Sequence, residues 1–314
     1  MTGHTGCTVV LCEAGAVCGL DVRGSASGTR QVDALNISHI VEQVHAIMLC
    51  GGSSFGLDAA GGVMRYLEEK GIGFDVGVTK IPIVPTAVIF DLFFGKTGAR
   101  PTASMGYEAC VNAGEVAGEG SVGAGTGATV GKLFDVTRAM KGGVGTSSIF
   151  MPDGLVVGAL VVVNAFGDIV DNVTGKIIAG ARTSAESFGF ANTVDCLKRG
   201  IVKKQFGLLN TTLGVVATNA RFNKREATKV AQMAQGGLIK TDARPCLERY
   251  SCAKSMRSSG RRYRHGCMAN TGDFQAQGSC SEPVGGQNGI QHSRPSLAAG
   301  VRDCVRHGGR RPQD

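Results

Sequence analysis

The chain has 314 residues and a formal net charge of +8, and nearly all of the excess positive charge falls in residues 238–314. It contains no apolar run near the ~20 residues that a membrane-spanning helix needs, and no N-terminal signal in which charged residues precede an apolar stretch. These features argue against a membrane protein and predict a cytoplasmic one. Glycine is abundant, with 48 residues, and Trp is absent, so many tight turns and close backbone approaches are expected.

The predicted elements mix hairpins with a few helices, which is typical of a layered α+β domain and not of a doubly wound sheet. Two short strands, 8–12 and 16–20, are joined by a Glu-Ala-Gly turn and favour a hairpin. The apolar run 45–50 predicts a buried strand, and the glycines after it allow a sharp turn into a helix over 59–70. The other predicted elements are strands at 87–92, 154–163 and 212–218, and helices at 103–114 and 227–236.

The sequence changes character after residue 240. Arg, Ser, Gly, Cys and Gln dominate there, and no window keeps a helix or strand period, which is typical of a disordered segment. A basic nucleic-acid-binding arm is an alternative interpretation, but aromatic residues are nearly absent and no nucleic-acid-binding motif is present. We therefore predict an atypical basic tail over 241–314.

The positions of the histidines and cysteines limit the chemistry. The stretch 46–264 contains no histidine, so a Ser-His-Asp or Cys-His arrangement would lack its base. The 11 cysteines form no Cys-x-x-Cys pair and have no histidine spacing that would suit zinc. We therefore expect no metal and no organic cofactor, and an enzyme with this sequence needs a base of another kind.

One short stretch can supply such a base. Asn210-Thr211-Thr212 runs directly into an apolar, β-branched segment, which predicts that Thr211 opens a strand. A Thr hydroxyl is a weak nucleophile unless a base lies beside it, and cutting the peptide bond before a Thr frees an α-amine that can serve as that base. The reference pKa of such an amine, about 7.7–8.0, suits neutral pH. For an isolated Asn-Thr pair, an ordinary solvated strand start is the simpler interpretation.

A second stretch, residues 123–133, is rich in glycine and ends near Gly131-Lys132, as a phosphate-binding loop does. The spacing before Gly131-Lys132 is one residue short, and Leu133 stands where a hydroxyl that binds Mg²⁺ is required. We therefore interpret this stretch as a structural glycine loop.

Several segments, taken in order, resemble the DmpA-type aminopeptidase family, which includes L-aminopeptidase/D-esterases, β-peptidyl aminopeptidases and 6-aminohexanoate-oligomer endo-hydrolases. The resemblance covers residues 5–238. The matching segments are GLDVRG (19–24), GGSSFGLDAA (51–60), PIVP (82–85), MGY (105–107), VGAGTG (122–127), MKGGVG (140–145), VNA (163–165) and NTT (210–212).

The resemblance implies an αββα sandwich of the DmpA/ornithine-acetyltransferase-like type, made as one precursor. Cleavage between Asn210 and Thr211 would give a large chain, residues 1–210, and a small chain that starts with residues 211–240. The two chains would stay together and assemble into homo-oligomers. Thr211 would be the nucleophile and, through its amine, the base, while Asn164 would help to form the oxyanion hole and Tyr107 and Lys141 would line the site. The substrate would be a small peptide or oligoamide, with no nucleic-acid or membrane partner.

Each of these roles has a physical basis and an ordinary alternative. An Asn amide can donate a hydrogen bond to a developing oxyanion, and a cation such as Lys141 near a new α-amine would favour the neutral amine. Without the resemblance, Asn164 would be interpreted as a turn residue, Tyr107 as a helix packing residue and Lys141 as a solvated charge.

The tail departs from the family pattern. Relatives continue after Gly237 with an acidic strand that contains Asp-Gly-Asp. This sequence does not reproduce that strand, and a shift of reading frame would explain the abrupt change in composition. Two hypotheses follow. The first is a self-processing amidohydrolase or aminopeptidase that acts through a Thr acyl-enzyme. The alternative is an inactive homologue with a truncated core that acts only as a binding protein.

Overall fold

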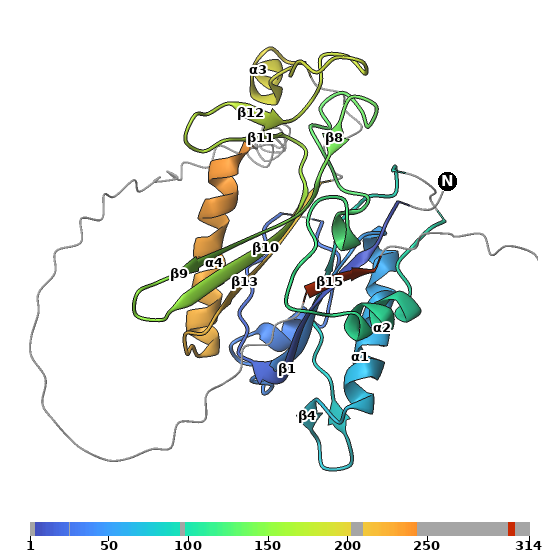
Figure 1. The fold of residues 1–314 in the computed structure, drawn as a ribbon, viewed down its shortest axis with the longest axis vertical. Coiled ribbons are helices and arrows are strands. Elements are labelled where there is room, and N and C mark those ends of the chain that lie inside the picture. Colours follow the sequence, from blue (N-terminus) through green and yellow to red (C-terminus); the bar gives the residue numbers. More distant parts are fainter. Residues whose placement is uncertain (1–3, 25, 95–97, 202–209, 244–300, 305–314) are drawn as a thin grey trace, which may run out of the picture. The chain divides into compact units, whose positions relative to one another are not determined.

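The computed structural model describes residues 4–24, 26–94, 98–201, 210–243 and 301–304 (Figure 1). Three sheets of three or more strands and four α-helices make up most of this part of the chain. The α-helices are α1 (Ala59–Glu69), α2 (Ala103–Val111), α3 (Thr193–Lys198) and α4 (Lys224–Thr241), and the 3₁₀ turns are η1 (Val32–Leu35), η2 (Ser53–Asp58) and η3 (Gly123–Gly125). No helix in the described ranges is long and apolar enough to cross a membrane.

The first sheet has the strand order β15-β1-β3-β6-β2. Its strands are β1 (Cys7–Ala16), β2 (Thr29–Arg30), β3 (Val44–Cys50), β6 (Thr86–Val88) and β15 (Val301–Cys304). β1 pairs antiparallel with β3, and β3 pairs parallel with β6. The second sheet is antiparallel, in the order β13-β10-β9, and contains β9 (Gly143–Phe150), β10 (Val156–Asn164) and β13 (Thr211–Thr218).

The smaller pieces of sheet lie in the loops between these elements. A third sheet has the order β12-β11-β14 and contains β11 (Asp168–Val170), β12 (Ile177–Ala179) and β14 (Asp242–Ala243). Two hairpin-like pairs join β4 (Phe74–Asp75) to β5 (Lys80–Ile81), and β7 (Thr129–Val130) to β8 (Met140–Lys141).

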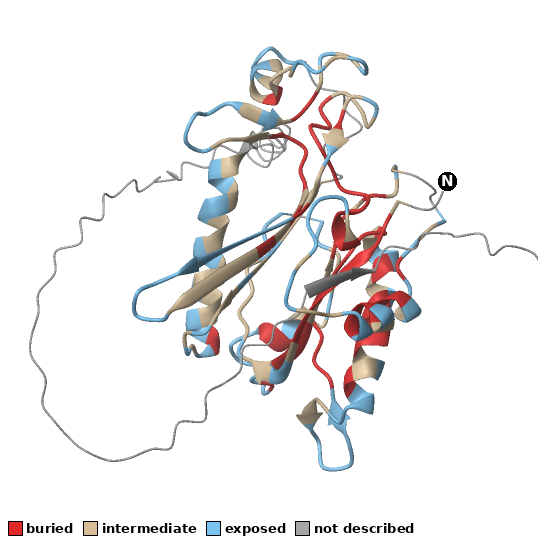
Figure 2. Cartoon of the chain, viewed as in Figure 1, coloured by how far each residue is buried: buried red, intermediate tan, exposed pale blue. Residues whose placement is uncertain are grey.

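The two faces of β3 pack against different layers, because side chains alternate along a strand. Ala46, Met48 and Cys50 join the cluster that contains the apolar faces of α1 and α2. Leu49 and the partly buried Ile47 join a second cluster, which includes residues of the second sheet. The helix pair, the first sheet and the second sheet are therefore three successive layers, with the best buried residues in the first two (Figure 2).

The contact between α1 and α2 depends on a glycine. A methyl group at Gly62 would overlap the backbone carbonyl oxygen of Ala103 on α2, whereas a methyl group at the preceding Gly61 would lie 3.8 Å from the Ala103 side chain. Backbone atoms cannot move aside as a flexible side chain can, so position 62 requires glycine and position 61 does not.

We expect Gly62→Ala to lower the free energy of unfolding by about 3 kcal/mol, because it forces the two helices apart. Gly61→Ala is the matched control. It should leave stability unchanged or raise it by up to about 1 kcal/mol, since alanine is the better helix former. Urea unfolding followed by circular dichroism measures both. Equal effects of the two substitutions would contradict the close approach.

The structure differs from the sequence predictions in a few elements. The predicted hairpin over 8–20 is instead one strand, β1, whose pairing with β3 shifts register between Leu11 and Ala16. Gly15 lies in this irregular part with a φ of 80°, so the Glu-Ala-Gly signal marks an irregularity within one strand and not a turn between two. α4 continues past Gly236 and Gly237 to Thr241, since glycine weakens a helix without ending it.

Most of the predicted tail, 241–314, lies outside the described residues. The exceptions after Thr241 are 242–243 and 301–304, which are the strands β14 and β15. β15 pairs antiparallel with β1, so that residues 304 and 7 are opposite each other.

The first residue of α4 ties this helix to the N-terminal part of the chain. Lys224 is buried, and its Nζ donates to the carbonyl oxygens of Ala34 at 3.0 Å, Asn36 at 3.0 Å and His39 at 3.1 Å. A buried ammonium is tolerated only when its donors are satisfied, and here three carbonyls do so. α4 is thus held to residues 34–39 by bonds that do not depend on the chain between them.

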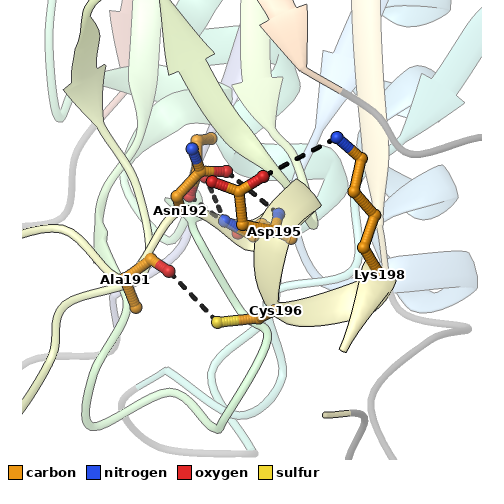
Figure 3. A network of polar contacts seen from close by, with 7 residues as sticks. Ala191, Asn192, Asp195, Cys196 and Lys198 are labelled. Atoms are coloured by element: carbon orange, nitrogen blue, oxygen red, sulfur yellow. Dashed lines mark hydrogen bonds and ion pairs between the residues drawn. The ribbon is translucent and has the colours of Figure 1, made fainter. Parts of the chain in front are cut away.

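The short helix α3 begins at an Asn cap (Figure 3). The side chain of Asn192 accepts from the backbone N–H of Asp195 at 3.2 Å, and the Cys196 thiol donates to the carbonyl of Ala191 at 3.1 Å. Asp195 and Lys198 form an exposed ion pair at 3.7 Å. Exposed ion pairs of this kind contribute little stability. The contacts of Asn192 are those of an ordinary helix cap.

Candidate active site

Thr211 opens β13 directly opposite Asn164, the last residue of β10. Residues opposite each other in an antiparallel ladder have their side chains on the same face of the sheet. On that face, Leu213 and Val162 pack into the cluster that contains Leu49 of the first sheet. The Thr211 and Asn164 side chains are therefore on the face of the second sheet that is directed at the first sheet.

The Asn164 side chain is fully buried, and both ends of its amide have partners. Its Oδ1 accepts from the Thr129 backbone N–H at 3.0 Å and from Lys132 Nζ at 2.7 Å. Its Nδ2 donates to the carbonyl oxygen of Phe90 at 3.0 Å. These contacts fix the amide orientation and leave the second Nδ2 hydrogen as a donor for another acceptor.

Lys132 is the residue that sequence reasoning missed. Its side chain is buried, and Nζ donates both to the Asn164 carbonyl oxygen at 2.8 Å and to Oδ1 of the same residue. This places a cation next to the Asn164 amide and one strand away from Thr211. From the sequence, the glycine loop that carries Lys132 is interpreted as a structural loop, which gives Lys132 no role in the site. The signal that could have revealed this residue is a lysine between Val130 and Leu133, in a run with no other charge.

Lys141 borders this group through Thr129, whose backbone N–H donates to Asn164 Oδ1. It is opposite Thr129 in the β7–β8 pair, and its Nζ donates to the carbonyl oxygen of Thr126 and lies 4.3 Å from the centre of the Phe94 ring. Burial lowers the pKa of Lys141 to about 8, and the charge of Asp91 opposes that shift. Lys141 therefore borders the site without a hydrogen bond to Asn164.

The glycines after Lys141 have a structural explanation. A methyl group at Gly142 would overlap the carbonyl oxygen of Val163, the residue before Asn164. The Lys-Gly-Gly segment thus lets the backbone of the β8–β9 connection approach the end of β10.

Tyr107 belongs to a different layer. It lies on α2, where its hydroxyl donates to Glu69 of α1 at 2.6 Å, its ring meets Tyr66 edge-on at a centroid distance of 5.8 Å, and Arg65 lies over the ring at 4.2 Å. The hydrogen bond to Glu69 raises the pKa of the Tyr107 phenol. The first sheet separates this helix layer from the face that carries Thr211. The structure brings Thr211 and Asn164 together, with Lys141 nearby, but does not bring Tyr107 to them.

Asn210 precedes Thr211 and is half-buried, while residues 202–209 before it lie outside the described ranges. The peptide bond between Asn210 and Thr211 is therefore at the very start of β13, beside the end of β10. Within the described part of the chain, no group of three or more His, Cys, Asp or Glu side chains could hold a metal ion.

A small hollow adjoins Asn164, which we call the aromatic hollow. It is lined by three aromatic side chains and five other residues: Phe90, Asp91, Phe93, Phe94, Gly127, Thr129, Lys132 and Val136. Three of these residues, Phe90, Thr129 and Lys132, hold the Asn164 amide. Asp91 is buried and accepts from the Gly52 backbone N–H at 2.6 Å, and burial raises the pKa of its carboxyl.

The fold mixes helices and strands, and its site places Thr211, at the start of a strand, opposite the buried Asn164. The buried Lys132 contacts the Asn164 amide. The chain belongs to Peptidase family S58, because the sequence model of that family matches residues 1–247. The family predicted from the sequence segments is thereby confirmed.

Individual relatives agree with this membership. An uncharacterized aminopeptidase of Mycobacterium leprae is 42% identical over 253 residues, which are 75% of this chain and 66% of the relative. A 6-aminohexanoate-oligomer endohydrolase of Kocuria sp. is 31% identical over 243 residues, 75% of this chain and 64% of that enzyme. This chain thus spans just under two thirds of the length of these relatives.

A solved structure shares the fold. The PH0078 protein of Pyrococcus horikoshii superposes with a TM-score of 0.55 at 21% sequence identity, over 77% of this chain and 62% of that protein. At so low an identity, this agreement shows that the two chains share a fold.

Proposed function

We propose that this chain is a self-processing amide hydrolase of the peptidase type, with Thr211 as its nucleophile. The observation that carries the proposal is the register of β10 and β13, which sets Thr211 opposite Asn164 on the face directed at the first sheet. The names of the relatives support amide substrates, either peptides or short oligoamides such as those of 6-aminohexanoate. The complete fold would be an αββα sandwich, working in the cytoplasm as a homo-oligomer.

The first reaction is cleavage of the chain itself. The Thr211 hydroxyl attacks the Asn210 carbonyl carbon, the bond from that carbon to the Thr211 nitrogen breaks, and the nitrogen takes up a proton as an ester forms. Water then hydrolyses the ester, which gives a carboxylate at Asn210 and frees both the hydroxyl and the α-amine of Thr211. The amine is the base that the hydroxyl needs.

The second reaction uses the freed threonine on substrate. The α-amine accepts the hydroxyl proton as Oγ1 attacks the substrate carbonyl, and the leaving amine departs with that proton. The remaining Nδ2 hydrogen of Asn164 is a donor for the oxyanion that forms, and water hydrolyses the resulting acyl-enzyme. The buried Lys132 cation disfavours protonation of the nearby amine, so the amine stays a base near neutral pH.

The two products of self-cleavage would remain together for reasons visible in the fold. All eight residues of β13 are paired with β10, and Lys224 donates to three carbonyls of residues 34–39. Neither set of contacts requires an intact bond between Asn210 and Thr211.

We expect the purified protein to show two masses under denaturing conditions, those of residues 1–210 and 211–314, and to elute as one particle under native conditions. Mass spectrometry of the intact chains and N-terminal sequencing of the smaller one test this directly. A single uncut chain without amide-hydrolysing activity would contradict the proposal and favour a binding-only homologue.

A further inference from the structure

Asp91 is a buried carboxyl that the proposed mechanism does not use. Only 5% of this residue is exposed, and it lines the aromatic hollow directly after Phe90. Its Oδ1 accepts a hydrogen bond from the Gly52 backbone N–H at 2.6 Å. No Lys, Arg or His in the described ranges forms an ion pair with it. Burying a carboxyl is costly, and this one is stabilised by hydrogen bonding and packing.

The Asp91 side chain joins the segment after β6 to the turn after β3. Backbone hydrogen bonds already connect the two segments at residue 89: the Ile89 N–H donates to the Cys50 carbonyl at 2.8 Å, and the Ser53 N–H donates to the Ile89 carbonyl at 3.0 Å. The bond from Gly52 to the Asp91 carboxyl adds a second point of attachment two residues further on. Residue 90 is therefore held to the turn from both sides.

This attachment bears directly on Asn164. The carbonyl oxygen of Phe90, between the two attached residues, accepts from Asn164 Nδ2 at 3.0 Å. Thr129 and Lys132 fix the other end of the same amide. An amide group is planar, so a fixed Phe90 carbonyl also fixes the direction of the second Nδ2 hydrogen, the proposed oxyanion donor.

The Asp91 carboxyl also packs against the loop that carries Thr129. A methyl group at Gly127 would overlap Asp91 Oδ2, and so would a methyl group at Gly51. Gly127 is two residues before Thr129, whose backbone N–H donates to Asn164 Oδ1. The segments that hold the two ends of the Asn164 amide thus pack on one side chain.

We propose that Asp91 is a positioning residue for amide hydrolysis, which holds the Asn164 amide in its oxyanion-stabilising orientation through the Phe90 carbonyl and the Gly127 loop. This inference rests on the proposed function and adds a residue outside the reacting groups. The charge of Asp91 acts on Lys141, which bonds to Thr126 and not to Asn164, so the positioning role depends on the acceptor at Oδ1 and on the shape of the carboxyl. Oxyanion donors are effective because their geometry is fixed before the reaction.

The test measures kcat and KM for leucine p-nitroanilide, with kcat divided by the amount of self-cleaved chain determined by mass. We expect Asp91→Ala to lower kcat by about 10²-fold and to leave KM within about twofold, because the oxyanion forms after the substrate has bound. Asp91→Asn should keep kcat within about threefold, since its Oδ1 can still accept from Gly52 and its amide nitrogen is nearly as large as the Oδ2 it replaces.

Gly62→Ala is the matched control for a loss of stability alone. It disturbs the contact between α1 and α2, in the helix layer, so its kcat per cleaved chain should equal that of the unchanged protein. If Asp91→Ala fails to fold, Gly127→Ala takes its place with the same expected loss of kcat, because the added methyl group would displace the same carboxyl.

Two results would overturn the positioning role without touching the proposed function. One is a kcat in Asp91→Ala or Gly127→Ala that is no lower than in Gly62→Ala. The other is a loss in Asp91→Asn as large as in Asp91→Ala or Gly127→Ala, which would show that the negative charge itself is required. An unchanged protein that neither cleaves itself nor hydrolyses the amide would instead overturn the proposed function, and this inference with it.

Discussion

Replacing Thr211 by valine should abolish both self-cleavage and amide hydrolysis. Valine has nearly the same shape and keeps the β-branched character that suits a strand start, so the loss comes from the hydroxyl alone. Removal of a catalytic nucleophile typically costs about 10⁴-fold or more in rate. We expect one uncut chain by mass spectrometry and turnover below detection, with the circular dichroism spectrum unchanged.

The neighbouring residue supplies the matched control. Thr212 lies opposite Val163, on the other face of the sheet, and its buried hydroxyl finds no hydrogen-bond partner among the described residues. Thr212→Val should therefore leave cleavage and turnover unchanged and stability equal or slightly higher. Thr211→Ser should restore both reactions at a reduced rate. Normal cleavage in Thr211→Val, or equal losses in both valine variants, would contradict the assigned nucleophile.

Replacing Lys132 by methionine should lower kcat by up to about 10²–10³-fold, the loss typical of removing one oxyanion donor, because Lys132 holds the Asn164 amide that is the proposed donor. Methionine approximates the buried stem of the side chain but lacks the ammonium that holds Asn164 Oδ1. The Thr129 backbone N–H still donates to the same oxygen, so the fold should persist with the amide less well fixed. Steady-state kinetics with a leucine p-nitroanilide measure the effect.

A pH profile separates this electrostatic role from a structural one. In the proposed mechanism the Lys132 cation disfavours protonation of the Thr211 α-amine, so removal of this cation should raise the pKa of the amine. Activity requires the neutral amine, and the acid limb of the kcat/KM profile should therefore move to higher pH in Lys132→Met. Lys141→Met should move it less, because Lys141 bonds to Thr126 and not to Asn164. A larger shift in Lys141→Met would restore the role that the sequence alone gave to Lys141.

Local sequence signals were enough to predict the family and most of the main elements. Apolar runs and glycine signals located β3, α1, α2, β10 and β13 to within a few residues, because hydrophobic periodicity and turn residues act locally. The Asn-Thr-Thr segment before a β-branched run was enough to put Thr211 at the start of a strand, as the structure has it. The same local signals predicted a hairpin over 8–20 that is in fact one irregular strand.

Which polar residues contact one another could not be predicted from the sequence, because it depends on how distant segments pack. Tyr107 lies on α2, and Lys132 lies in the glycine loop. No local sequence signal indicates that the Tyr107 hydroxyl donates to Glu69 in the helix layer or that Lys132 Nζ donates to Asn164. Such neighbours are set by the register of β10 against β13 and by the packing of the glycine loop under β10. These contacts join residues far apart in the chain, where a one-residue slip would turn Thr211 to the opposite face.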